Sequence, residues 1–173
     1  LRGFVSFSMR HPPESLVDTL NQYLGIGAKA VLDQEGTLDK FVGDAVVAFF
    51  NAPLAQEHYA LRAVRAALTI REQTSALKAR LAPENRLSYG IGISVGEAIV
   101  GNIGTPQRLD YTAIGPSVNM ANRLQAAAEP GQILLTAEVY QQTKDHIRAR
   151  PILLDGIPEP HEQTQAFELI DLL

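Results

Sequence analysis

Two short segments carry side chains that suit phosphate and metal chemistry. The first, residues 39–44 (DKFVGD), places Lys40 in an extended run and Asp44 after Gly43, in a dipeptide typical of a hairpin turn. A carboxylate is a hard oxygen ligand that suits Mg²⁺, and glycine lets the backbone come close to a phosphate. An aspartate in a hairpin is also common for structural reasons alone, so the segment by itself only makes Asp44 a candidate ligand.

The second segment, residues 109–123 (LDYTAIGPSVNMANR), places Asn119 and Arg123 four residues apart at the start of an expected helix. Residues at this spacing share one helix face. Arginine has a fixed charge and a fork of donors that matches phosphate oxygens. The alternative interpretation of such a pair is a solvated helix surface, and the segment alone does not decide between the two.

The composition limits the kinds of partner. A chain of 173 residues, 46% of them hydrophobic, has the size of one domain. With 15 basic and 19 acidic residues it lacks the basic surface that nucleic acid requires. The sequence has no cysteine, which excludes disulfides and thiol catalysis. No apolar run approaches the roughly 20 residues of a membrane span, so we expect a soluble, cytoplasmic domain without membrane contact of its own.

Hydrophobic periodicity predicts an α+β fold. Helices are expected over residues 14–32, 56–81, 118–128 and 137–144, the first broken or thinned by Gly25 and Gly27. Strands are expected over residues 37–42, 45–50, 87–101 with a turn near Gly96, 109–114, 132–136 and 167–172. This order predicts a ferredoxin-like two-layer sandwich, with helices on one face of a mostly antiparallel sheet. Residues 158–160 are expected in a surface loop, and residues 1–173 form one domain whose first strand begins before Leu1.

Together, these segments resemble the catalytic domain of class III adenylyl and guanylyl cyclases, in particular the bacterial adenylyl cyclases with threonine in the base-reading position. The matching stretches are LRGFVSFS, DKFVGDAVVAFFNAP, HYALRAVRAAL, YGIGISVGEAIVGNIG, LDYTAIGPSVNMANRLQ and PGQILLT. The resemblance implies the class III cyclase fold and conversion of ATP to cyclic AMP for signal transduction. It also implies a homodimer with two shared active sites, and cyclases of this kind are commonly fused to upstream sensor or membrane domains.

The resemblance also assigns the metal and triphosphate groups. Asp44 and the carbonyl of Leu1 would bind the catalytic metals, two Mg²⁺ or Mn²⁺ ions per site, and Gly3 and Phe4 would offer backbone groups to the triphosphate. The family's other metal-binding aspartate precedes the position of Leu1. Two metal ions would lower the pKa of the ribose 3′-hydroxyl, so that no strong protein base is required.

Four further residues would bind the nucleoside and the reacting phosphate. The resemblance makes Lys40 and Thr112 the readers of the base. Asn119 would orient the ribose and Arg123 would hold the phosphate in the transition state, both from the partner subunit. The reaction implied is an in-line attack of the ribose 3′-oxygen on the α-phosphorus, with pyrophosphate leaving.

The base-reading pair favours ATP. Adenine presents N1 as an acceptor and its N6 amino group as a donor, which match the ammonium of Lys40 and an acceptor oxygen of Thr112. Guanine reverses both groups, and such mismatches can cost on the order of several kcal/mol. Guanylyl cyclases of the family are expected to carry Glu at the position of Lys40. With Thr112 in this position, the chain resembles the subgroup of cyclases in which bicarbonate stimulation occurs.

Departures from the family pattern leave two alternatives open. A phosphate-binding lysine expected in a late loop is replaced by Ile157, and Arg108 is a candidate to meet this charge, although it is equally explained as a solvated loop residue. These departures favour a catalytically impaired module that binds nucleotide or dimerises. Guanylyl cyclase activity is the other alternative.

Overall fold

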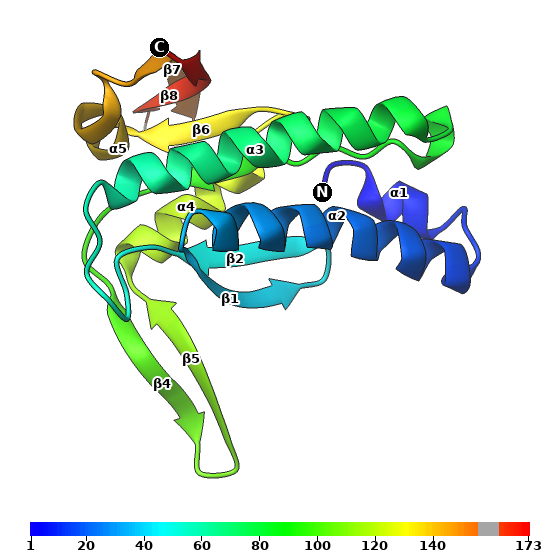
Figure 1. The fold of residues 1–173 in the computed structure, drawn as a ribbon, viewed down its shortest axis with the longest axis horizontal. Helices are drawn as coiled ribbons and strands as arrows, with labels where there is room; N and C mark the ends of the chain where they lie inside the picture. Colours follow the sequence, from blue (N-terminus) through cyan, green and yellow to red (C-terminus); the bar gives the residue numbers. More distant parts are fainter. Residues whose placement is uncertain (156–162) are drawn as a thin grey trace.

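The computed structural model describes residues 1–155 and 163–173. Its strands form three small sheets, and helices pack against the strands in the body of the molecule (Figure 1). The helices are α1 (Phe4–Ser8), α2 (Pro13–Asp33), α3 (Tyr59–Arg80), the 3₁₀ helix η1 (Pro83–Asn85), α4 (Pro116–Ala127) and α5 (Ala137–Thr143). The strands are β1 (Thr37–Val42), β2 (Ala45–Phe49), β3 (Ile91–Ile93), β4 (Ile99–Thr105), β5 (Arg108–Ile114), β6 (Ile133–Thr136), β7 (Ile147–Asp155) and β8 (Gln163–Leu172). The predicted α+β class is confirmed.

A four-stranded sheet in the order β3-β6-β8-β7 holds the main core. The β3–β6 pair is parallel and the other two pairs are antiparallel. Successive residues of a strand point to opposite faces. Accordingly Leu135 packs with Leu61 and Val64 of α3, whereas Leu134 packs with Leu124 of α4. Helices therefore cover both faces of this sheet, so the predicted α+β class holds but the expectation of helices on one face is wrong.

The long helix α2 is continuous, so the predicted break at its glycines is wrong. A proline at the first turn suits the start of the helix, because its missing N–H would have no partner there. Gly27 is buried, and a Cβ atom added to it would lie 2.8 Å from the side chain of Val46. This glycine lets helix α2 lie close to strand β2 and does not interrupt the helix.

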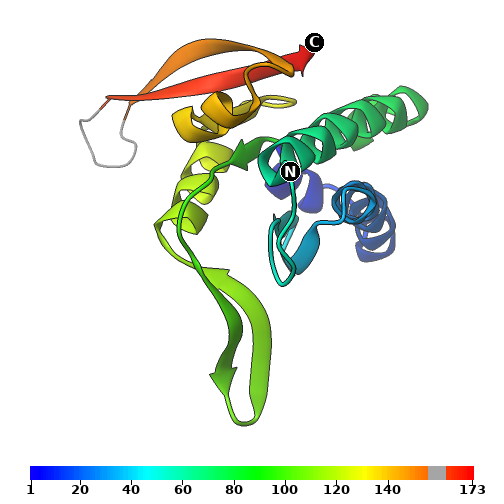
Figure 2. The same ribbon diagram turned by 60° about the vertical axis from the view of Figure 1, so that its left-hand side comes forward.

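Two hairpins stand apart from the four-stranded sheet. The β1–β2 pair packs beneath α2, and its Gly43-Asp44 turn is as predicted. Strands β4 and β5 form a long antiparallel arm, hereafter the β4–β5 arm, that protrudes from the body of the molecule (Figures 1 and 2). The two strands predicted on either side of a turn near Gly96 correspond to the short β3 and the start of β4.

Strand β7 was not predicted from the sequence, and β8 begins earlier than expected. Residues 147–155 (IRARPILLD) mix charges with Pro151, which argues against an interior strand. The structure resolves this conflict because β7 is the edge strand of its sheet. An edge strand tolerates a proline that cannot donate a hydrogen bond. The proline-rich stretch predicted as a surface loop lies outside the described residues.

The start of the chain packs against the second core cluster, formed by Phe7, Tyr23, Leu87, Tyr89 and their neighbours. Arg2 forms a single antiparallel bridge with Ser88. Its guanidinium donates to the carbonyl oxygens of Gln125 and Ala128, at the end of helix α4. These contacts hold the chain next to both α4 and the β3 region.

Candidate functional site

Lys40 and Thr112 meet through a carboxylate that sequence reasoning did not single out. The hydroxyl of Thr112, on β5, donates to Oδ2 of Asp39 at 2.6 Å, and Lys40 Nζ lies 3.5 Å from Asp39 Oδ1. The Asp39 side chain is 3% exposed and that of Lys40 is 41% exposed. The structure therefore brings the two predicted base-reading residues to the same place, with Asp39 between them.

The predicted metal ligand Asp44 lies in the β1–β2 turn with its carboxylate partly exposed. Its Oδ2 lies 2.6 Å from the backbone nitrogen of Leu1, so the two predicted metal-binding residues are adjacent. Burial raises the pKa of the nearby Tyr89 hydroxyl, and the negative charge of Asp44 raises it further. Tyr89 therefore stays neutral at physiological pH.

Gly3 and Phe4 lie directly after Leu1. Gly3 is exposed and adopts a φ of +82° in the left-handed region, immediately before helix α1. Glycine adopts this conformation without the steric cost of a Cβ atom. Phe4 is partly buried against the core cluster that contains Phe7. Leu1 contacts Asp44, so the backbone of these residues starts beside the β1–β2 turn. Their role in binding the triphosphate stays a prediction.

Asn119 and Arg123 lie on helix α4 and both are exposed. The helix begins after Gly115, whose carbonyl accepts the N–H of Asn119, and it is anchored to the sheet through Leu124. Within residues 1–155 and 163–173, neither side chain makes a hydrogen bond or an ion pair. Helix α4 thus holds a guanidinium and an amide open to solvent on one face.

The structure does not join all predicted site residues within one chain. In Figure 1 the β1–β2 turn lies near the N-terminus, whereas α4 lies toward the other end of that hairpin. Arg108 lies at the start of β5, near the tip of the β4–β5 arm. Its side chain is 82% exposed and its Nε lies 3.5 Å from Asp110 Oδ2. The position of Ile157 lies outside the described residues.

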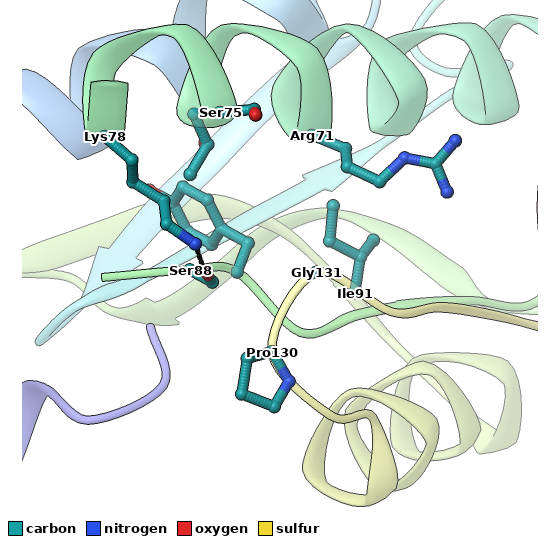
Figure 3. Close-up of a pocket in the computed structure, with 9 residues that line it drawn as sticks. Arg71, Ser75, Lys78, Ser88, Ile91, Pro130 and Gly131 are labelled. Carbon is teal, nitrogen blue, oxygen red and sulfur yellow. Dashed lines mark hydrogen bonds between the residues drawn. The ribbon is translucent and has the colours of Figure 1, made fainter. Parts of the chain in front are cut away.

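A cavity of about 160 Å³ between helix α3 and strand β3 contains none of the predicted site residues (Figure 3). Lys78 donates to the hydroxyl of Ser88 at 2.6 Å on its wall, and Arg71 donates to backbone carbonyls of β8. A wider and more open hollow, of about 490 Å³, lies where the β4–β5 arm meets helix α4. Because both cations of the smaller cavity already have protein partners, we place the candidate site at the exposed hairpin and helix.

Asp44 fits a metal that is bound partly by the protein and partly by its substrate. Among the described residues, no group of three or more His, Cys, Asp or Glu side chains lies close enough together to hold a metal ion. Mg²⁺ is commonly bound by one or two carboxylates together with substrate phosphates, so an isolated carboxylate beside backbone oxygens is compatible with this ion. Among the described residues, the helices are too short or too polar to span a membrane.

Comparisons with known proteins identify the family of the chain. The family described as "Adenylate and Guanylate cyclase catalytic domain" matches residues 1–154. Proteins of this class are the class III nucleotide cyclases. The chain belongs to this family, and the fold and family predicted from the sequence are confirmed.

Two of the relatives are named as adenylate cyclases. Adenylate cyclase 1 of Rhizobium meliloti is 36% identical over 155 residues, which cover 86% of this chain and 23% of that protein. The terminal-differentiation-specific adenylate cyclase of Dictyostelium discoideum is 32% identical over 99% of this chain, but only 8% of that protein is covered. The chain thus spans about a quarter or less of these two relatives.

Two solved structures match nearly the whole chain. The adenylyl cyclase CyaB from P. aeruginosa has a TM-score of 0.88 and 36% identity, covering 98% of this chain and 89% of that chain. The guanylyl cyclase Cya2 has a TM-score of 0.90 and 29% identity, covering 100% of this chain and 89% of that chain. Structural similarity alone therefore does not distinguish the two substrates.

Proposed function

We propose that this chain is the catalytic domain of an adenylyl cyclase, which converts ATP to 3′,5′-cyclic AMP and pyrophosphate at a homodimer interface. The observation that carries the proposal is the cluster of Lys40, Asp39 and Thr112. It places a cationic donor next to a hydroxyl oxygen, and this pair complements N1 and the N6 amino group of adenine. With GTP, the N1–H donor of guanine would face the Lys40 ammonium, and its O6 acceptor would face the Thr112 oxygen.

A second copy of the chain explains why the remaining groups lie apart. Asp44 lies in the β1–β2 turn, whereas Asn119 and Arg123 lie exposed on α4, without a side-chain partner among the described residues. In a two-fold dimer, the Asp44 region of each chain can face helix α4 of the other chain, which gives two equivalent shared sites. We infer that Asp44 of one subunit and the Asn119/Arg123 pair of the other hold one ATP molecule.

In the proposed reaction, the ribose 3′-oxygen forms a bond to the α-phosphorus and loses its proton. The bond from the α-phosphorus to the bridging oxygen breaks, and pyrophosphate leaves with that electron pair. Asn119 orients the ribose, and the guanidinium of Arg123 stabilises the charge that develops on the phosphate oxygens. Backbone groups of Gly3 and Phe4 hold the triphosphate.

Asp44 and the Leu1 carbonyl would bind Mg²⁺ or Mn²⁺, two ions per site with the substrate phosphates. These ions supply charge neutralisation and a lower pKa for the 3′-hydroxyl. The protein contributes position and fixed charge, so a separate strong base is not needed. The impaired-module alternative differs in that nucleotide would bind without turnover.

The function is tested with a purified protein that contains this domain, incubated with ATP or GTP and either Mg²⁺ or Mn²⁺. We expect cyclic AMP from ATP and little cyclic GMP from GTP. Lys40→Glu should shift the preference toward GTP, because a carboxylate accepts from the N1–H of guanine. Binding of an ATP analogue without any cyclic product would support the impaired module and contradict the proposal.

A further inference from the structure

We propose that Asp39 is a positioning residue that makes Thr112 a hydrogen-bond acceptor toward the purine, and so sets the preference for ATP over GTP. The inference rests on the proposed function, because it concerns the base-reading site of that reaction. It goes beyond Lys40 and Thr112 by assigning the selectivity to a third, buried side chain.

The first argument is the direction of one hydrogen bond. Thr112 Oγ1 lies 2.6 Å from Asp39 Oδ2. A carboxylate can only accept, so the single hydroxyl hydrogen of Thr112 must lie in this bond. What Oγ1 then presents to a ligand is lone pairs. A threonine without this partner could rotate its hydroxyl and either donate or accept.

The second argument is the free-energy cost of burying the Asp39 carboxylate. Its side chain is 3% exposed, and Oδ1 is buried without a hydrogen bond among the described residues. The nearest cation is the Lys40 ammonium, whose nitrogen lies 3.5 Å away, longer than a normal N–H···O hydrogen bond. Because the Lys40 side chain is 41% exposed, solvent screens this ion pair, and such pairs contribute little net stability. Stability alone therefore does not explain an aspartate at this position.

The third argument is the backbone. Neighbouring residues of a regular strand point to opposite faces of the sheet. The β1–β2 register shifts between Leu38 and Lys40, so that Asp39 is the extra residue of a bulge. A bulge re-aims side chains, and here it lets Asp39 and Lys40 lie on the same side. The hairpin is thus shaped to bring the carboxylate between Lys40 and Thr112.

These arguments together explain selectivity at the purine six-position. The N6 amino group of adenine donates to the lone pairs of Thr112 Oγ1. The O6 atom of guanine is an acceptor and would face those lone pairs without a hydrogen between them. Because the hydroxyl hydrogen is held by Asp39, Thr112 cannot rotate to satisfy O6, and guanine is disfavoured.

The experiment compares Asp39→Asn with the unaltered protein. An asparagine amide can donate to Thr112 Oγ1, which frees the hydroxyl hydrogen for O6 of guanine. We expect the ATP-to-GTP ratio of kcat/KM, and the ratio of affinities for non-hydrolysable ATP and GTP analogues by calorimetry, to fall by at least about tenfold. Asp39→Ala is the second variant, for use if the asparagine variant does not fold. It removes the acceptor of the Thr112 hydroxyl, which can then donate to O6 of guanine, so both ATP-to-GTP ratios should fall.

Two further variants separate positioning from structure. Asp33→Asn removes an equal charge from an exposed Lys29 ion pair on α2, and it should leave both ratios unchanged. Thr112→Val should lower both ATP-to-GTP ratios. The double variant with Asp39→Asn should lower them no further, because both substitutions act through the Thr112 hydroxyl. A purely structural role of Asp39 would lower binding of both nucleotides equally.

The inference is overturned if folded Asp39→Asn or Asp39→Ala protein keeps the wild-type ratios, or if the two substitutions at Asp39 and Thr112 act additively. Failure of the proposed function is a separate result. It would appear as absence of cyclic AMP from the unaltered protein, whereas the calorimetric ratio is measured without turnover and still tests Asp39.

Discussion

The four-stranded sheet and the β4–β5 arm place their apolar residues in opposite environments. In the sheet, Leu134, Leu135 and Leu169 are at most 1% exposed. In the arm, Ile99 is 72% exposed, and Leu109 and Ile114 are 57% and 52% exposed. Large exposed apolar side chains on a protruding arm are typical of an interaction site. The sheet therefore stabilises the single chain, whereas we expect the arm to contact a second copy in the proposed dimer.

The glycines of the two regions sharpen this contrast. A Cβ atom on Gly92, in β3, would lie 2.3 Å from the carbonyl oxygen of Ala121 and 2.4 Å from the nitrogen of Gln125, both backbone atoms of α4. On Gly101, in β4, an added Cβ would have no neighbour within 4 Å. We expect Gly92→Ala to lower the free energy of unfolding by about 3 kcal/mol, because backbone atoms cannot move aside.

Gly101→Ala is the matched control, and its free energy of unfolding should change by less than about 1 kcal/mol. Urea denaturation of both variants measures the difference. Equal destabilisation would mean that the arm is packed as tightly as the sheet, and the contrast between the two regions would be lost.

The arm should be needed for dimerisation more than for folding. Ile99 pairs with Ile114 in the hairpin register, where the arm meets helix α4. We expect Ile99→Asp to weaken dimerisation by about 10- to 100-fold, because it places a charge in an apolar contact. The unfolding midpoint of the monomer should hardly change. Sedimentation velocity over a concentration series measures the dimer affinity.

Leu54→Asp supplies the control for this variant. Leu54 is 77% exposed but lies outside the arm, between β2 and α3. Its substitution should leave dimer affinity unaltered. If both variants weaken the dimer alike, or neither does, the arm is not the interface.

The smallest predicted effect concerns two neighbouring buried tyrosines, with ring centroids 6.4 Å apart. The Tyr23 hydroxyl accepts from the N–H of Leu87 at 2.9 Å and donates to the carbonyl of Asn85 at 3.3 Å. The Tyr89 hydroxyl has no hydrogen-bond partner among the described residues. Tyr23→Phe should therefore cost about 1 kcal/mol of stability at pH 7, and Tyr89→Phe close to none.

The same pair predicts a dependence on pH. Burial raises the pKa of Tyr89 above its ordinary value of 10.0, so above that pH the unfolded chain loses this proton before the folded chain does. The free energy of unfolding is therefore unaffected by Tyr89 ionisation below pH 10, and it declines as the pH rises from there toward the folded-state pKa. Tyr89→Phe should make this alkaline decline less steep, as measured by unfolding at pH 9 to 11. An unchanged slope would contradict the assignment.

The local patterns of the sequence predicted most elements, including the Gly43-Asp44 turn and helix α4. Packing between elements was not predictable in the same way. Gly27 was expected to break a helix, but it provides space for Val46. Strand β7 was missed because its charges and Pro151 suit an edge position that only the sheet order reveals.

The candidate site shows the same division. Motif resemblance pointed to Lys40, Asp44, Thr112, Asn119 and Arg123, and their roles stay predictions. Asp39 was not singled out, although it directly precedes Lys40, because its importance depends on a strand bulge and on contact with β5. Register and long-range contacts of this kind are set by the whole fold and leave no local pattern.

The central claim, that each active site is shared between two chains, is tested most directly by complementation. Asp44→Ala and Arg123→Ala should each abolish cyclic AMP formation in a homodimer. Mixing the two proteins, after subunit exchange, should restore about a quarter of the wild-type activity, because half of the dimers then hold one intact site out of two. A mixture of Asn119→Ala and Arg123→Ala, which alter the same side of the site, should stay inactive. If the Asp44→Ala and Arg123→Ala mixture stays inactive while forming mixed dimers, or either variant is active alone, the shared-site account is contradicted.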